Sequence, residues 1–220
     1  MKERKWPKVS IVMATLNAER VLEDCLISIA SQNYPKDKIE IILGDGGSTD
    51  ATKEIAKKYN ALIVHNPLKT AESGKMTALR RSTGEYIALI DSDNILPSSD
   101  WLQRMIKPLL HHTEAVGSEP IEYSWRKQDG FITRYCALLG MNDPLVHFLG
   151  NYDRTNLLSG TWTEVRRSEV QHDGYLLVHF NSFPLPTIGA NGTVLRASFL
   201  KSYTKGNYLF DIDILSSYLH

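Results

Sequence analysis

Several features that mark specialised proteins are missing from this 220-residue sequence. It has only two cysteines, Cys25 and Cys136, which lie far apart and outside any metal-ligand spacing, and this excludes a disulfide scaffold and a thiolate zinc site. We expect both to be buried structural thiols in a reducing compartment. Basic and acidic residues balance at 25 each, so the overall charge does not favour nucleic acid as a partner.

Long hydrophobic runs are also missing. No apolar stretch approaches the ~18 residues that a transmembrane helix requires, and the charged N-terminus lacks the apolar segment of a signal peptide. These residues predict a cytoplasmic protein. Because the sequence stops at His220 without a turn or cap signal, we expect the natural protein to continue. A membrane-attached part beyond that end, at the cytoplasmic face, is left open.

The first hundred residues alternate between apolar runs and amphipathic patterns. Runs typical of buried strands cover residues 9–14, 39–43, 61–64 and 85–90, and helical spacing covers residues 19–32, 51–59, 71–82 and 101–110. This alternation predicts an α/β fold with a doubly wound, mostly parallel sheet and helices on both faces. After about residue 100 the pattern becomes irregular, but no linker marks a second domain, so we expect one domain over residues 1–220.

Polar residues follow three of the predicted strands. They are Thr15 and Asn17, Asp45, and the pair Asp91 and Asp93. Because ligands of such sheets bind beyond the carboxyl ends of the strands, we expect the three clusters to meet at one crevice. Two carboxylates one residue apart can bind one Mg²⁺ or Mn²⁺ together with substrate phosphates. The alternative is that Asp91 caps a turn and Asp93 is only solvated, and that residues 44–50 form a plain capped turn.

The order of these segments resembles glycosyltransferase family 2, the large inverting family with the GT-A fold. The motif T-x-N-x-E corresponds to residues 15–19, D-D-G-S-T-D to 45–50, G-K-x-x-A-L-N to 74–80 and D-x-D to 91–93. Two positions depart from the family pattern: Gly46 replaces the second Asp, and Arg80 stands where Asn is frequent. Neither departure removes a residue that the chemistry needs.

The resemblance implies a site for a nucleotide-diphosphate sugar, most often of uridine, in about residues 1–100. Residues 101–220 would supply the acceptor surface of the same catalytic domain. Asp93 would bind Mn²⁺ or Mg²⁺ directly, and Asp91 would lie near the metal and the ribose. The other residues implied to hold the nucleotide are Thr15, Asn17, Glu19, Asp45, Lys75 and Ser92. The acceptor would be a hydroxyl or phosphate of a glycan or a polyprenyl-phosphate lipid.

The second half matches the family pattern in two places. Residues 189–196 resemble a G-x-N-x-x-x-R segment near the donor sugar and acceptor. Asp211 aligns with the general base of an acidic pair in which Phe210 replaces the Glu, and Asp213 is the second assignment. One base and one metal suffice for inverting transfer. A solvated or helix-capping aspartate remains the alternative for this position.

Three other functions share features of this sequence. A dinucleotide-dependent dehydrogenase is disfavoured, because Thr49 stands at the third glycine position of its motif. A nucleotidyltransferase shares the sheet and the metal, but normally has a glycine-rich basic loop where this chain has residues 15–19. A catalytically inert nucleotide-sugar-binding module is kept open by Phe210. The sequence favours a metal-dependent, inverting glycosyltransferase that uses a UDP-sugar.

Overall fold

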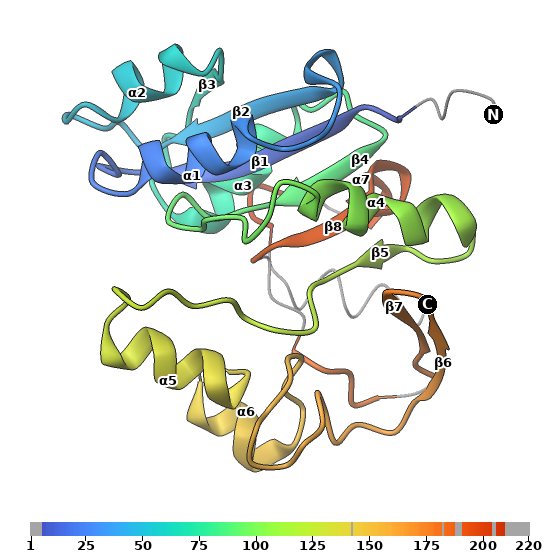
Figure 1. The fold of residues 1–220 in the computed structure, drawn as a ribbon. Coiled ribbons are helices and arrows are strands. Elements are labelled where there is room, and N and C mark those ends of the chain that lie inside the picture. Colours follow the sequence, from blue (N-terminus) through green and yellow to red (C-terminus); the bar gives the residue numbers. More distant parts are fainter. Residues whose placement is uncertain (1–5, 142, 182, 188–190, 204–205, 210–220) are drawn as a thin grey trace. The chain divides into compact units, whose positions relative to one another are not determined.

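The computed structural model describes residues 6–141, 143–181, 183–187, 191–203 and 206–209 (Figure 1). These residues group into two compact units. The first contains residues 6–118 and the described part of 191–209, and the second contains residues 119–187. Strands β8 and β5, from residues after 100, complete the sheet of the first unit. A single catalytic domain over the whole chain stays a prediction.

The first unit is built on one mixed sheet. In the described residues its strand order is β3-β2-β1-β4-β8-β5. The parallel strands are β1 (Val9–Thr15), β2 (Ile39–Asp45), β3 (Leu62–His65) and β4 (Tyr86–Leu89), and the antiparallel ones are β8 (Thr193–Arg196) and β5 (Gly117–Ser118). The four strands predicted from apolar runs are confirmed within one or two residues. The two antiparallel strands were not predicted.

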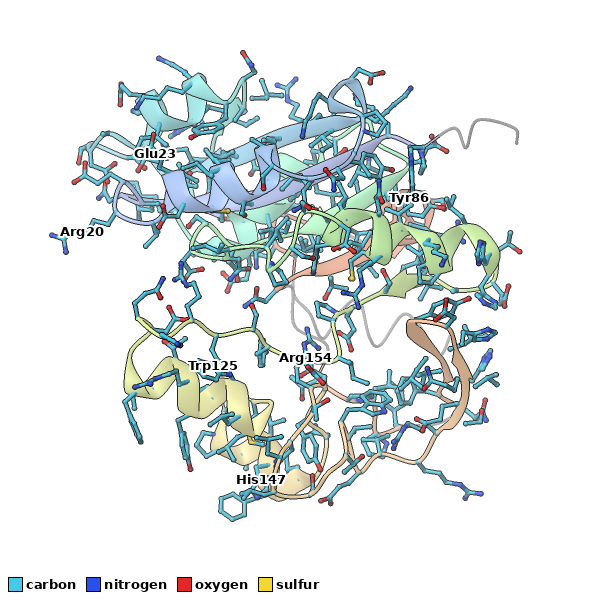
Figure 2. All side chains as sticks on the ribbon, in the orientation of Figure 1. Arg20, Glu23, Tyr86, Trp125, His147 and Arg154 are labelled. Atoms are coloured by element: carbon cyan, nitrogen blue, oxygen red, sulfur yellow. The ribbon has the colours of Figure 1, made fainter. Side chains whose placement is uncertain are left out.

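Helices cover both faces of this sheet (Figure 1), and the side chains between the layers are drawn in Figure 2. One face packs against α1 (Leu22–Ala30), α2 (Thr52–Lys58) and α4 (Trp101–His111), and the other against α3 (Ala71–Leu79) and α7 (Ala197–Tyr203). A short 3₁₀ helix, Lys36–Lys38, precedes β2. Because alternate strand residues point to opposite faces, Ile11 and Met13 join the first core while Val12 joins the second. The predicted doubly wound arrangement is thus confirmed.

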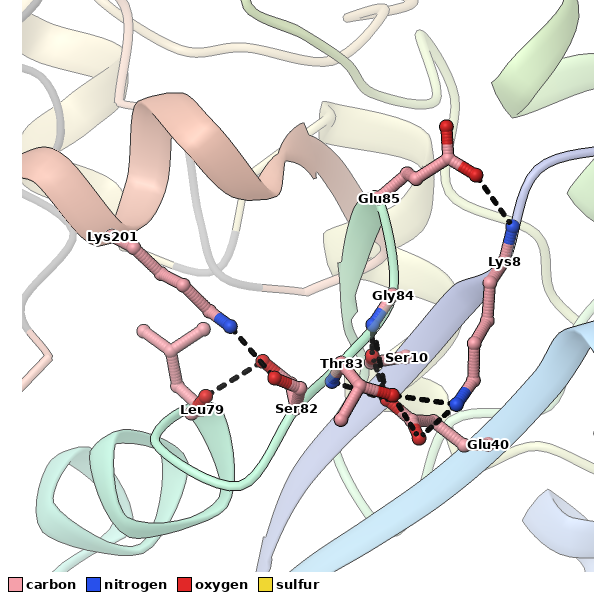
Figure 3. Close-up of polar contacts among 9 residues, drawn as sticks. All are labelled: Lys8, Ser10, Glu40, Leu79, Ser82, Thr83, Gly84, Glu85 and Lys201. Atoms are coloured by element: carbon pink, nitrogen blue, oxygen red, sulfur yellow. Dashed lines mark hydrogen bonds and ion pairs between the residues drawn. The ribbon is translucent and has the colours of Figure 1, made fainter.

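A polar network holds the amino ends of β1, β2 and β4 together (Figure 3). Glu40 lies at its centre: Lys8 Nζ is 2.7 Å from Glu40 Oε2, and the Thr83 amide donates to Oε1 over 2.6 Å. Ser10 and Gly84 donate to the same oxygen. Burial raises the pKa of Glu40, but the hydrogen bonds from Lys8, Ser10 and Thr83 outweigh it and lower the pKa to about 2. This ionised carboxylate therefore stabilises the fold at the edge away from Asp45.

We expect Glu40→Gln to lower the free energy of unfolding by ~1–2 kcal/mol at neutral pH, because the amide leaves some of these donors unsatisfied. The folded-state pKa lies below the ordinary value of 4.5. The contribution is therefore present above pH 4.5 and is lost as pH falls towards 2. Urea unfolding across this range measures it. The exposed Glu54→Gln is the control, and a difference that does not shrink with acid would contradict the assignment.

The part of the second unit that the structure describes contains two short helices and a hairpin. The helices are α5 (Phe131–Leu139) and α6 (Pro144–Leu149), and β6 (Ser168–His172) pairs antiparallel with β7 (Tyr175–His179). Gly140 and Gly150 end the helices at φ of 67° and 66°, a conformation that favours glycine. Adding a Cβ at Gly140 would also place it 2.4 Å from the Arg154 carbonyl oxygen. These glycines fix where both helices stop.

A buried arginine organises the interior of the second unit (Figure 2). The side chain of Arg154 is fully buried, and its Nη1 lies 2.6 Å from Asp153 Oδ2 and 3.1 Å from Glu119 Oε2. Its guanidinium also lies 5.2 Å from the ring centroid of Tyr123. Burial raises the pKa of Glu119 to about 7, although the positive charge of Arg154 opposes this. Removing Arg154 would leave two carboxylates buried without their cation, so we assign it a structural role.

Candidate active site

Three polar segments follow neighbouring strands at one edge of the sheet. Thr15 is the register partner of Asp45, so β1 and β2 end together, and β4 ends opposite Val12. The chain then continues through Ile90, whose amide donates to the Val12 carbonyl, into Asp91. The carboxyl ends of three parallel strands therefore present the predicted clusters on the same side of the sheet.

Asp45 is held by donors from the protein itself. Its side chain is buried, and its Oδ2 accepts from the amides of Gly47 (3.0 Å) and Ser48 (2.9 Å). Its Oδ1 accepts from the hydroxyls of Thr15 (3.1 Å) and Ser48. Burial raises the pKa of Asp45, but the hydrogen bonds from Ser48, Gly47 and Thr15 prevail and lower it. A carboxylate has about four acceptor positions, so the predicted contact to a nucleotide would have to replace one of these donors.

Further hydrogen bonds join the segment after β1 to the loop after β2. Asn17 donates its amide to Ser48 Oγ (2.9 Å), and its side-chain oxygen accepts from the Thr49 amide (2.9 Å). Glu19 accepts from the Ala51 amide over 3.0 Å, and its own amide donates to an Asp50 oxygen. Asn17 lies at φ 52°, a left-handed conformation that asparagine tolerates well. These bonds join residues 15–19 and 45–51 into one structural unit, which we call the clasp.

Lys75 links helix α3 to the segment after β4. Its side chain is largely buried, and Nζ lies 2.7 Å from Asp91 Oδ1. Helix α3 can approach this closely because glycines face each other: a Cβ at Gly44 would lie 2.0 Å from the Gly74 carbonyl oxygen, and one at Gly74 would lie 2.7 Å from Ala14 Cβ. The two glycines therefore set the position of Lys75.

The Asp91–Asn94 turn is closed by its last residue. The Asp91 amide donates to Asn94 Oδ1 (3.0 Å), and the Asn94 amide donates back to the Asp91 carbonyl (3.0 Å). Asn94 Nδ2 lies 3.5 Å from Asp93 Oδ1, and the Asp93 side chain is exposed, while Ser92 is half-buried. The turn therefore presents the Asp93 carboxylate to solvent. The sequence motif did not single out Asn94, although an asparagine that closes a turn is a familiar local signal.

Hydrogen bonds join helix α1 and Gln32 beyond it to this turn and to the segment that follows the turn. The Cys25 thiol donates to the Asp91 carbonyl (3.7 Å), and Ser28 Oγ accepts from the Leu96 amide (3.1 Å). Farther along, Gln32 donates to the Ser98 carbonyl over 2.8 Å. Burial, followed by the negative charges of Asp93 and Asp91, raises the pKa of Cys25 to about 12. The expected buried thiol is confirmed for Cys25, whereas Cys136 is only half-buried.

Two arginines of the recognised motifs have structural partners. Arg80 donates to the Gly206 carbonyl and to Asn207 Oδ1, so it fastens the segment 206–209 to α3. Arg196 donates to the carbonyls of Leu109 and His112, at the amino end of β4 and away from Asp91. Within the G-x-N-x-x-x-R segment the Gly192 amide donates to the Leu89 carbonyl at the end of β4 (2.8 Å), whereas residues 189 and 190 lie outside the described residues. Asp211 and Asp213 lie outside the described residues.

Known proteins resemble this chain in sequence and in fold. Residues 10–180 match the model of glycosyl transferase family 2. The glycosyltransferase AglE of Haloferax volcanii is 29% identical over 141 residues, which cover 61% of this chain and 46% of that protein. A TarS structure from Staphylococcus aureus in complex with UDP has a TM-score of 0.58 at 18% identity, over 96% of this chain and 55% of that chain.

A further structure shares the fold. Glucosyl-3-phosphoglycerate synthase of Mycobacterium tuberculosis, in complex with Mn²⁺, UDP and glucosyl-3-phosphoglycerate, has a TM-score of 0.55 at 19% identity, over 95% of this chain and 64% of that chain. The chain therefore spans about half of AglE and less than two thirds of the two structures. Both likenesses confirm the predicted GT-A fold. Since the family model covers residues 10–180 of 220, the chain belongs to glycosyl transferase family 2.

Proposed function

We propose that this chain contains the donor site and the catalytic centre of a metal-dependent, inverting glycosyltransferase. Its donor would be a nucleotide-diphosphate sugar, with a UDP-sugar favoured, and its acceptor a hydroxyl or phosphate of a glycan or polyprenyl lipid. The observation that carries the proposal is the joining of the family motifs at one edge of the sheet, in the Thr15–Asp45 contact and the Lys75–Asp91 ion pair. The related structures that contain UDP support the choice of nucleotide.

The residues present fit a hard divalent cation. Asp93 has an exposed carboxylate, and Asp91 stands two residues before it at the end of β4. Within the described ranges, no group of three or more His, Cys, Asp or Glu side chains is placed to hold a metal ion. A pair of carboxylates matches Mn²⁺ or Mg²⁺, because these ions take much of their coordination from substrate phosphates and water. The bound ion would neutralise charge on the departing diphosphate.

Different side chains would contact different parts of the donor. Lys75 carries a positive charge next to Asp91, where it can also reach a diphosphate. The clasp formed by Thr15, Asn17, Glu19 and Asp45 would shape the nucleoside pocket, and Ser92 would add a polar contact within the D-x-D turn. Because most clasp donors are already paired with the protein, we expect the pocket to be preorganised before the donor binds.

The transfer step would need one base. Asp211 would take the proton from the acceptor hydroxyl as that oxygen attacks the anomeric carbon. The bond from the anomeric carbon to the diphosphate oxygen breaks on the opposite face, which inverts the configuration. For a phosphate acceptor, already ionised, the same attack proceeds without this proton transfer. Asp211 follows the described residues 206–209 in the chain. Arg80 donates to the Gly206 carbonyl of that segment, and the Leu209 amide donates to the Glu72 carbonyl.

We expect Asp211→Asn to reduce transfer to a hydroxyl acceptor by about 10²–10⁴-fold, while UDP still binds, because only the base is lost. Asp213→Asn is the matched control and should retain most activity. The measurement is the release of UDP from candidate UDP-sugars, in parallel with calorimetric UDP binding. A larger loss in Asp213→Asn would transfer the role to that residue. Binding without turnover in the wild type, across donors and acceptors, would favour the inert binding module instead.

A further inference from the structure

The helices of the second unit expose large apolar side chains. Neither α5 nor α6 contains a buried residue, although both are predominantly apolar. The exposed side chains include Phe148 at 84%, Leu158 at 77%, Phe131 at 70%, Ile132 at 69%, Leu157 at 66% and Leu145 at 59%. Scattered single side chains of this kind are ordinary, but a contiguous group marks a surface that binds a partner or a membrane.

Hydrogen bonds connect the segments that carry these side chains. The Leu157 amide donates to the Leu138 carbonyl at the end of α5 over 3.1 Å. Asn156 Nδ2 lies 3.4 Å from His147 Nδ1 on α6, so the loop 156–158 links the two helices. On α5 the exposed apolar residues stand at positions 131, 132, 135 and 138, which form one stripe along a helix. We call α5, α6 and residues 157–158 the apolar face.

Basic residues lie on and just before the helices of the apolar face. Arg134 is the only formally charged residue within the two helices, and Arg126 and Lys127 precede them. Of the nearby acidic residues, Asp129 pairs with Arg126 (2.9 Å) and Asp143 caps α6 by accepting from the Leu145 amide (2.9 Å), while Glu122 and Glu164 are exposed. Trp125, which Figure 2 places beside α5, is 48% exposed. Basic and amphipathic aromatic side chains bordering an apolar surface are typical of contact with a bilayer interface.

We propose that the apolar face docks onto the surface of a phospholipid bilayer that contains anionic headgroups. The helices would lie in the interface, with Phe131, Ile132 and Phe148 among the acyl chains and with Lys127 and Arg134 at the headgroups. Among the described residues, no helix is long and apolar enough to span a membrane. The proposal goes beyond the proposed function, because none of these residues takes part in the donor site or the transfer step.

The test is co-sedimentation with vesicles of phosphatidylcholine alone and of phosphatidylcholine mixed with phosphatidylglycerol. We expect the wild type to bind the mixed vesicles more tightly. Ile132→Glu with Phe148→Glu should weaken this binding more than about tenfold, since each exposed side chain loses its transfer into the acyl region. Ile27→Glu, at a side chain that is 51% exposed on α1, is the matched control and should change binding less than twofold. Arg134→Glu should weaken binding only to the anionic vesicles.

Three results would overturn the proposal. The first is a wild type that sediments with neither kind of vesicle, and the second is a double variant that binds as well as the wild type. The third is a dimer in analytical ultracentrifugation that the double variant abolishes without any vesicle binding, which would assign the face to a second copy. Circular dichroism checks the fold, and Phe148→Ser alone repeats the test if the double variant unfolds. UDP binding should be unchanged in all of these variants. A failure of donor binding can therefore be distinguished from a failure of vesicle binding.

Discussion

Gly44→Ala is expected to lower the free energy of unfolding by ~3 kcal/mol or more and to weaken nucleotide binding at the same time. The added Cβ would lie 2.0 Å from the Gly74 carbonyl oxygen, a backbone atom that cannot move unless α3 moves. Because Lys75 is the next residue on that helix, its 2.7 Å contact with Asp91 would be lost as α3 shifts. One methyl group would therefore damage both the core and the candidate site.

Urea unfolding and calorimetric titration with UDP measure the two effects. Gly46→Ala is the matched control, because a Cβ there would lie 3.4 Å from its nearest neighbours, Leu16 Cδ1 and the Cα of Lys69. We expect that variant to unfold within about 0.5 kcal/mol of the wild type. A Gly44→Ala protein as stable as the Gly46→Ala protein would show that α3 does not pack against β2 in this way.

Asp93→Ala is expected to reduce Mn²⁺-dependent UDP affinity by about 100-fold or more. Its carboxylate is exposed at the end of the turn that Asn94 closes, so in our account it is a direct ligand of the ion. Loss of a supporting group around a bound metal already costs about 10–100-fold in affinity, and loss of a ligand should cost at least as much. Asp93 is exposed, so the fold should persist.

The experiment compares UDP affinity with Mn²⁺ and with EDTA in both proteins. The wild type should bind more weakly in EDTA, whereas Asp93→Ala should be weak in both conditions. Asp24→Ala, which removes an exposed carboxylate of α1, serves as the control and should match the wild type. Equal metal dependence in Asp93→Ala and the wild type would exclude Asp93 as the ligand.

The parallel part of the sheet could be predicted because each strand is a short apolar run bounded by polar residues. Val9–Thr15 and Tyr86–Leu89 are of this kind, and their ends place the D-x-D and T-x-N-x-E motifs. The antiparallel strands could not be predicted in the same way. Gly117–Ser118 has two residues and no apolar pattern, and the pairing of Thr193–Arg196 with β4 depends on contacts across about a hundred residues.

The candidate site was predicted as a set of residues but not as a set of contacts. Local pattern identifies Asn17 and Ser48 as polar residues after strands, yet it cannot show that they bind each other. The family resemblance placed residues 189–196 near the donor sugar and acceptor, and the Arg196 side chain at the end of this segment donates to carbonyls at the end of α4. The spacing of residues along the sequence indicates the secondary structure of one segment. It does not show which residues from distant segments form hydrogen bonds in the folded protein.

The most direct test of the donor-site assignment is calorimetric titration of the wild type with UDP and with GDP, each in Mn²⁺, in Mg²⁺ and in EDTA. Our account predicts that UDP binds in the presence of a divalent ion and that the binding is lost in EDTA. If neither nucleotide binds under any of these conditions, the clasp and the D-x-D turn do not form a donor site, and the account is contradicted.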